Sequence, residues 1–168
     1  MKVQFDAFDI QAIAMYAERI NVVKRLNGAN SKKHDLKKSE WELHYVGAMG
    51  EFAVKKALGC PLSMDIYQGG DPSPDTMIGD LSAQIKTHSY IGRNLEFFID
   101  SMDAFNADIL IGVQLLSPVL CDVSGYIDKE SFKLIAKSKN YGYGDRLSIP
   151  ASALKSITNL YTGKLTCM

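Results

Sequence analysis

Residues 73–88, SPDTMIGDLSAQIKTH, decide the fold that we expect for this chain. Polar residues, among them Gln84 and Lys86, alternate there with apolar ones, which is typical of a strand with one buried face. The dipeptide Gly79-Asp80 favours a tight turn, so the residues before it should form the opposing strand of a hairpin. Such a hairpin would bring the carboxylate of Asp75 beside Gln84 and Lys86.

An acid, an amide and an amine in this arrangement suit phosphate chemistry. Carboxylate and amide oxygens are ligands that hard cations prefer, and they would come from Asp75 and Gln84. Lys86, two residues from the amide, could then steer a water molecule at a phosphate. Asp80 is nearer to Gln84 in sequence, but it lies in the turn, where aspartate is favoured for turn geometry alone. We therefore predict that Asp75 is the acid of the site.

A helix is expected over residues 39–59, before the hairpin. Ser39 and Glu42 have the spacing of a capping box at its start, and Gly59 is a typical helix end. Its apolar stripe is most simply core, and comprises Trp41, Tyr45, Ala48, Met49, Phe52 and Ala53. Glu51 does not belong to this stripe. The sequence alone allows an ordinary solvated glutamate there.

Two nearby glycines favour a functional role for Glu51 over that of an ordinary surface glutamate. Gly47 and Gly50 flank it, and each costs about 1 kcal/mol of helix stability relative to alanine. Close approach of another backbone would explain this cost. The environment of Glu51 would then be crowded, as expected of a residue in a functional site.

These residues resemble the motif of a known family of enzymes. Glu51 in GAMGEFAVKKALG, then Pro74-Asp75, then Gln84-Ile85-Lys86, looks like the PD-(D/E)xK nuclease superfamily, which includes restriction endonuclease-like and Holliday-junction-resolvase-like enzymes. The nearest likeness is to small phage and prophage members with a Gln-x-Lys motif, followed by a strand such as VSGYIDKESF here. Gln84 stands where glutamate or aspartate is usual.

The resemblance implies a restriction endonuclease-like core and metal-dependent hydrolysis of phosphodiester bonds. Asp75, Gln84, the backbone carbonyl of Ile85 and Glu51 would bind Mg²⁺ or Mn²⁺, and Lys86 would position the attacking water. Because Gln84 is neutral, metal affinity should be lower than in a Glu-x-Lys site, and Mn²⁺ should support activity better than Mg²⁺. The alternative from another class is a nucleic-acid-binding or phage accessory protein with the same fold and no catalysis.

Charge is balanced over the chain as a whole but uneven along it. The 19 basic and 19 acidic residues give zero net charge, which argues against a protein that coats nucleic acid through its global field. A local basic segment could contact the backbone of nucleic acid, which we expect to be DNA. The candidate contacts are Lys32, Lys33, Lys37 and Lys38, with His44 and His88 nearer to the motif. Alternatively, this basic segment is an ordinary surface loop whose lysines are solvated and bind nothing.

The remaining elements complete a mixed sheet. Helices are expected over residues 10–25, capped by Asp9, over 129–138 and over 152–160. Strands are expected over residues 62–67, 94–100, 108–116, 119–127 and 146–150, and a loop over 139–145. Residues 108–116 are almost continuously apolar, as in a central strand that is covered on both faces. The order indicates an α/β (α+β) fold with a mixed β-sheet flanked by helices.

Length and composition are typical of a single globular domain. The chain has 168 residues and no linker or repeat, so we expect one nuclease-like domain over 1–168, with an N-terminal helix and basic loop (1–38) before a core (39–160). Three cysteines without metal or paired spacing indicate neither a disulfide framework nor a zinc site. No apolar run suggests a membrane span, and we expect a cytoplasmic protein of a bacterium or phage-infected cell. A homodimer is compatible with the sequence.

Overall fold

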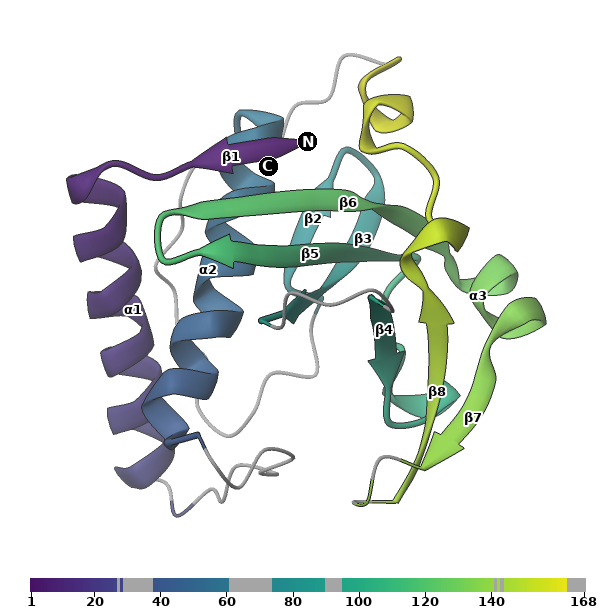
Figure 1. The fold of residues 1–168 in the computed structure, drawn as a ribbon, viewed down its shortest axis with the longest axis horizontal. Coiled ribbons are helices and arrows are strands. Elements are labelled where there is room, and N and C mark those ends of the chain that lie inside the picture. Colours follow the sequence, from purple (N-terminus) through teal and green to yellow (C-terminus); the bar gives the residue numbers. More distant parts are fainter. Residues whose placement is uncertain are drawn as a thin grey trace.

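The computed structural model of the chain describes residues 1–26, 28, 38–60, 74–89, 95–140, 142 and 144–162 (Figure 1). Its helices are α1 (Ala7–Leu26), α2 (Glu40–Leu58) and α3 (Lys129–Ile135), with short 3₁₀ helices η1 (Met102–Ala104), η2 (Ala151–Ala153) and η3 (Ile157–Thr162). Its strands are β1 (Lys2–Gln4), β2 (Thr76–Ile78), β3 (Leu81–His88), β4 (Glu96–Ile99), β5 (Ile109–Ser117), β6 (Leu120–Asp128), β7 (Lys137–Asn140) and β8 (Asp145–Pro150).

Five strands form the main sheet, in the order β1-β6-β5-β3-β2. The predicted hairpin is confirmed: β2 and β3 are antiparallel, and Ile78 pairs with Leu81 across the Gly79-Asp80 turn. β3 runs parallel to β5, whereas β5 and β6 are antiparallel neighbours. The sheet is therefore mixed, as expected, and β2 is one of its two edges.

A second sheet, in the order β4-β8-β7, lies against the face of the main sheet opposite to the long helices. Figure 1 shows α2 between α1 and the main sheet, and the second sheet on the other side of the molecule. The α/β (α+β) class is confirmed. Helices α1 and α2 cover one face only, because the later strands form a sheet of their own instead of extending the first.

Two hydrophobic cores fill the spaces between these layers. One core joins α1 and α2 to the main sheet, and Ile111 of β5 belongs to it. The other joins the main sheet to the second sheet and α3, and Leu110 belongs to that one. Neighbouring residues of β5 thus face opposite cores, which confirms that the apolar run is a strand covered on both faces.

The caps of α2 agree with the sequence interpretation. The Ser39 hydroxyl accepts a hydrogen bond from the Glu42 backbone N–H, and the Glu42 carboxylate accepts one from the Ser39 backbone N–H. Gly59 ends the helix in the left-handed conformation. At α1 the expected cap is wrong. Asp6 Oδ1 accepts a hydrogen bond from the Asp9 backbone N–H, and Asp9 Oδ2 accepts one from Asp6, so Asp6 caps a helix that starts at Ala7.

The C-terminal third departs most from expectation. The helix expected over 129–138 ends at Ile135, and the chain turns into β7, an exposed edge strand that also takes the start of the expected loop. In place of a helix over 152–160 there are two short 3₁₀ helices, separated by residues 154–156. Lys155 exchanges backbone hydrogen bonds with Tyr126 of β6, and this pairing prevents a continuous helix.

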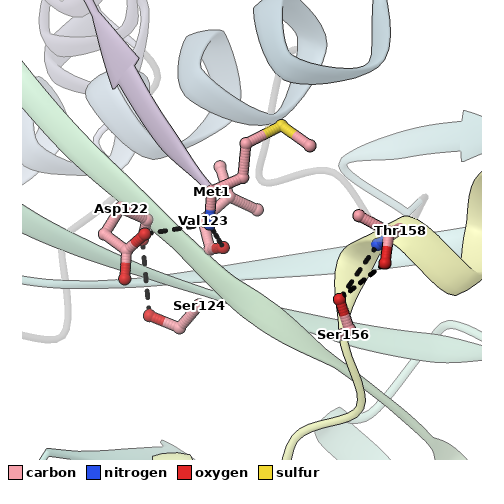
Figure 2. A network of polar contacts seen from close by, with 6 residues as sticks. All are labelled: Met1, Asp122, Val123, Ser124, Ser156 and Thr158. Carbon is pink, nitrogen blue, oxygen red and sulfur yellow. Dashed lines mark hydrogen bonds and ion pairs between the residues drawn. The ribbon is translucent and has the colours of Figure 1, made fainter.

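The amino terminus is tied to β6 (Figure 2). The ammonium group of Met1 donates to Asp122 Oδ1 at 2.9 Å and to the carbonyl oxygen of Val123 at 2.7 Å. Nearby, the hydroxyls of Ser156 and Thr158 share a hydrogen bond at the start of η3. The three-residue strand β1 is held in this way at the edge of the sheet opposite to β2.

Two further expectations concern residues 62–67 and the cysteines. The strand expected over 62–67 lies outside the described residues. The expectation that the cysteines form no disulfide is wrong for Cys60, which is disulfide-bonded, whereas Cys121 is free and buried. Among the described helices, none is long and apolar enough to cross a membrane.

The glycines of α2 have different roles. A Cβ atom on Gly50 would lie 1.8 Å from Thr87 Oγ1, so the helix contacts β3 at this point with no room for a methyl group. The neighbour is a side chain and not the backbone that we expected. A Cβ atom on Gly47 would meet nothing within 4 Å, and the structure gives no packing reason for that glycine.

We predict opposite effects of alanine at these two glycines. Gly50→Ala should lower the free energy of unfolding by roughly 1–3 kcal/mol, because an added group in a packed interface forces neighbours to shift. Gly47→Ala, the matched control, should raise it by up to about 1 kcal/mol through helix propensity alone. Chemical denaturation of both variants measures the two changes.

The double variant Gly50→Ala/Thr87→Ala identifies the cause. It should recover most of the stability lost in Gly50→Ala, because it removes the Thr87 hydroxyl, which is buried with no hydrogen-bond partner among the described residues. If the two changes are simply additive, the contact between Gly50 and Thr87 is not the source of the loss.

Candidate active site

Asp75 lies immediately before β2, at the edge of the main sheet. Its Oδ2 accepts a hydrogen bond from the backbone N–H of Ile85 at 2.6 Å. The ladder between β2 and β3 ends at the pair Thr76 and Ala83, so Ile85 lies two residues past the last pair. The carboxylate of Asp75 therefore occupies the position that a neighbouring strand would take, close to the plane of the sheet.

The carbonyl of Ile85 points to the same edge. Ser82 O accepts a hydrogen bond from the Asp108 backbone just before β5, so the peptide groups of even-numbered residues of β3 are directed at β5. In a strand the N–H and C=O of one residue point to the same side, and successive residues alternate. Both peptide groups of Ile85 are thus directed away from β5, toward Asp75. The Asp75 carboxylate and the Ile85 carbonyl therefore lie at the same edge of the sheet.

Glu51 lies on α2 and approaches the same site from the helix-covered face. The Tyr16 hydroxyl of α1 donates to Glu51 Oε2 at 3.3 Å. Burial raises the pKa of Glu51 from 4.5 to about 7, and the negative charge of Asp75 adds to this rise. The charge of Lys55 and the Tyr16 hydrogen bond oppose it. Glu51 and Asp75 are therefore near enough to repel each other when both are ionised.

Two residues of this site were missed in the sequence. Lys55 is buried, and its charge acts on Glu51. Its spacing of four residues from Glu51 on a helix could have indicated the pair. Tyr16 comes from another helix, and no local pattern separates it from the apolar residues of α1. Its ring also packs on Phe52, with 5.8 Å between ring centroids.

Gln84 projects from the other face of β3. Ala83 and Ile85 are buried in the core beneath α2, so the intervening side chain of Gln84 points toward the second sheet. Its Nε2 donates to the carbonyl oxygen of Ala104 at 3.3 Å. Its Oε1 is buried and has no hydrogen-bond partner in the described structure. A buried amide oxygen without a partner is costly, and it is suited to accept a cation or a donor.

Lys86 and His88 follow Gln84 on the same face. Lys86 pairs in register with Gly112 of β5, and a Cβ atom on Gly112 would contact the Phe97 ring of β4 at 2.5 Å. Lys86 therefore shares its face with the second sheet, and it is partly buried. His88 pairs in register with Gln114 and is also partly buried. Asp75, in the plane of the sheet, lies between this face and that of Glu51.

The expected nucleic-acid contacts are separated from this edge or are not described. Lys38 donates to the Ser89 hydroxyl, just past the end of β3. His44 lies about 10 Å along the helix axis from Glu51. Burial and the charge of Lys24 lower the pKa of His44. Lys32, Lys33 and Lys37 lie outside the described residues. Asp80 is exposed in its turn, as expected.

The oxygen groups at this edge fit a hard cation by chemical type. Within the described ranges, no group of three or more histidine, cysteine, aspartate or glutamate side chains is placed to hold a metal ion. Two carboxylates and a peptide carbonyl lie at this edge, whereas the amide oxygen of Gln84 is buried on the face toward the second sheet. Mg²⁺ and Mn²⁺ take such oxygen ligands and need not be held by protein groups alone.

We predict that the stability of the metal-free protein depends on pH through Glu51. Its folded pKa lies above the unfolded value, so the native state binds the proton more tightly. Stability should be greatest below pH 4.5 for this group and fall as pH rises to about 7, by about 3 kcal/mol at roughly 1.4 kcal/mol per pKa unit. Denaturant unfolding in the presence of a chelator, from pH 4.5 to 8, measures this fall.

Two variants serve as controls for the pH effect. Glu51→Gln should remove most of the fall, because the amide does not titrate. Asp75→Asn should make it smaller, because it removes the repelling charge. A wild-type curve with the same slope as Glu51→Gln across this range would contradict the assignment.

Comparison of the chain with family models, curated proteins and solved structures finds no match. Membership of the nuclease superfamily therefore stays a prediction, and it rests on the motif residues themselves.

Proposed function

We propose that the chain is a metal-dependent nuclease that hydrolyses phosphodiester bonds, with DNA as its expected substrate. The observation that supports this most is the pairing of Glu51 with Asp75 at the edge of β3. Burial raises the pKa of Glu51 to about 7, and the charge of Asp75 adds to the effect. Two acids that repel each other destabilise an apoprotein, whereas a cation beside both would stabilise them.

The residues that would hold Mg²⁺ or Mn²⁺ are Asp75, Gln84 through its amide oxygen, Ile85 through its carbonyl, and Glu51. Such a cation supplies a Lewis acid for the phosphate and a more acidic water as nucleophile. Tyr16 and Lys55 would orient Glu51 and limit its repulsion by Asp75. Lys86 would position the attacking water and stabilise the charge that gathers on the phosphate. Within the described residues, its ammonium group has no hydrogen bond or ion pair that would hold it elsewhere.

One observation favours the alternative function, a nucleic-acid-binding domain without catalysis. Gln84 is neutral, and its Nε2 is already bound to the carbonyl of Ala104. This hydrogen bond is compatible with a purely structural role of Gln84 as well as with a role as metal ligand. The two functions differ in whether metal ions bind and whether substrate is cut. A cytoplasmic location, in a bacterium or an infected cell, remains part of the same proposal.

Metal binding is the first test. Isothermal titration with Mn²⁺ should detect binding to the wild type, no binding to Asp75→Asn, and weaker binding to Glu51→Gln. Gln84→Glu should bind more tightly, because it adds a charge with almost no change in shape. Asp80→Asn is the matched control, since its carboxylate is exposed in the turn, and it should bind as the wild type does. If Asp80→Asn loses binding while Asp75→Asn keeps it, the assignment of the acid is wrong.

Cleavage is the second test, and Lys86 is its critical residue. Lys86→Ala should cut labelled DNA or RNA on the order of 100-fold more slowly, because it removes a charge that acts mainly in the transition state. Binding of nucleic acid and thermal stability should change little. Lys2→Ala, an exposed lysine on the opposite edge of the sheet, should cut at the wild-type rate.

The same assay decides between nuclease and binding domain. Wild type and Gln84→Glu are compared with Mg²⁺ and with Mn²⁺, on single-stranded, duplex and branched substrates. Failure of both proteins on every substrate, with nucleic-acid binding intact, would favour the non-catalytic domain. A Lys86→Ala variant that cuts as fast as wild type would exclude the proposed mechanism.

A further inference from the structure

Lys55 of α2 is a buried cation that makes no ion pair. Only 8% of the residue is exposed. Among the described residues, its ammonium group has neither a hydrogen bond nor an ion pair. Burying a charge costs free energy unless the charge is paired, and lysine is rarely buried without a partner. The protein itself therefore leaves this ammonium group without the anion that its burial calls for.

Glu51 stands four residues before Lys55, at a spacing where the two side chains usually pair. Residues so spaced lie about 40° apart around a helix and about 6 Å apart along its axis. A glutamate four residues before a lysine is also the favourable order for an ion pair. Here the Glu51 carboxylate instead accepts a hydrogen bond from the Tyr16 hydroxyl at 3.3 Å, and Lys55 acts on Glu51 only through its charge. The ammonium group is thus beside the candidate site and available to another anion.

The adjacent Lys56 shows the contrasting behaviour of a lysine with a structural role. It is exposed, its ammonium group forms an ion pair with Asp9 of α1, and it lies over the Phe5 ring at 5.9 Å from the centroid. Its charge is therefore offset within the protein. Lys55 is less exposed than Lys56 and has no such ion pair.

Lys55 and Lys86 approach the candidate site from opposite faces of the main sheet. Lys86 projects from β3 toward the second sheet, whereas Lys55 belongs to α2, which covers the other face. Figure 1 shows α2 on one side of the main sheet and the second sheet on the other. A phosphodiester has two non-bridging oxygens, which point in different directions. One lysine on each side of the Asp75 edge would suit a separate contact with each oxygen.

We propose that the ammonium group of Lys55 binds a non-bridging oxygen of the substrate phosphate, on the helix-covered side of the Asp75 edge. The inference rests on the proposed function, which places the phosphate at this edge. It adds a second phosphate-binding lysine to Lys86 and gives Lys55 a direct contact with substrate, beyond its electrostatic effect on Glu51.

The salt dependence of DNA binding tests this contact without cleavage. Fluorescence anisotropy of a labelled DNA duplex is measured in a chelator at several salt concentrations. The slope of log affinity against log salt should be smaller by about 0.9 in Lys55→Met than in wild type, because each neutralised phosphate of duplex DNA contributes that amount. Affinity at a fixed low salt concentration should fall by about 10-fold, as expected for one hydrogen bond between charged groups. Lys55→Arg keeps the charge and should keep the wild-type slope.

Lys56→Met is the matched control. It makes the same substitution at the next residue, whose charge is offset by Asp9, and it should keep the wild-type slope. Methionine preserves the length of the buried stem, and circular dichroism checks that each variant is folded. Lys55→Gln gives the same comparison if Lys55→Met does not fold.

Isothermal titration with Mn²⁺ separates the phosphate contact from a structural role. Lys55→Met should bind Mn²⁺ at least as tightly as wild type does, because it removes a positive charge beside Glu51. Weaker Mn²⁺ binding together with the wild-type slope would confine Lys55 to orienting Glu51, and would overturn the proposal.

The outcomes distinguish this inference from the nuclease proposal. If wild type binds Mn²⁺ and cuts DNA while Lys55→Met has the wild-type slope, the phosphate contact is wrong and the nuclease proposal stands. If wild type cuts no substrate but the slope falls in Lys55→Met, the contact is supported and catalysis is not. A wild type that binds no DNA at any salt concentration, in chelator or with Mn²⁺, overturns both.

Discussion

The packing of α2 on β3 at Gly50 is the contact on which the arrangement of the site depends. A Cβ atom there would lie 1.8 Å from Thr87 Oγ1, so a larger residue would force the Thr87 side chain or the helix to shift. Glu51 is the next residue of the helix, and its approach to Asp75 follows from this close contact. Tyr16 reaches Glu51 only because α1 packs along the other side of α2.

Acidic side chains lie at the edge of β3 beyond the end of β2. β2 is only three residues long, and the Asp75 carboxylate continues the hydrogen bonding of β3 where the strand is absent. An edge strand left without a partner is normally protected by water or by another chain. Here a carboxylate takes that place, and the partly buried Glu51, with its pKa raised to about 7, lies nearby. Such perturbed acids gather at functional sites more often than elsewhere.

The second sheet limits access to one face of β3. It covers the face of β3 that carries Gln84 and Lys86, while α2 covers the other face. Both faces of the strand are thus covered near its middle. Gln84 is held from the second-sheet side by the Ala104 carbonyl. Within the described residues, its amide oxygen is buried without a hydrogen-bond partner.

The sequence by itself determined the elements whose signals are local. The Gly79-Asp80 turn, the alternation along β3, the capping box at Ser39 and the apolar run of β5 each depend on neighbouring residues, and each was confirmed. Tertiary structure decided what depends on distant partners. Lys155 pairs with Tyr126 and so ends the expected C-terminal helix. The second sheet could not be predicted, because strand pairing across distant segments leaves no local pattern. For the same reason the sequence could name Glu51 and Asp75, but only the folded chain brings them together, because burial and repulsion arise between a helix and a sheet edge that meet in space alone.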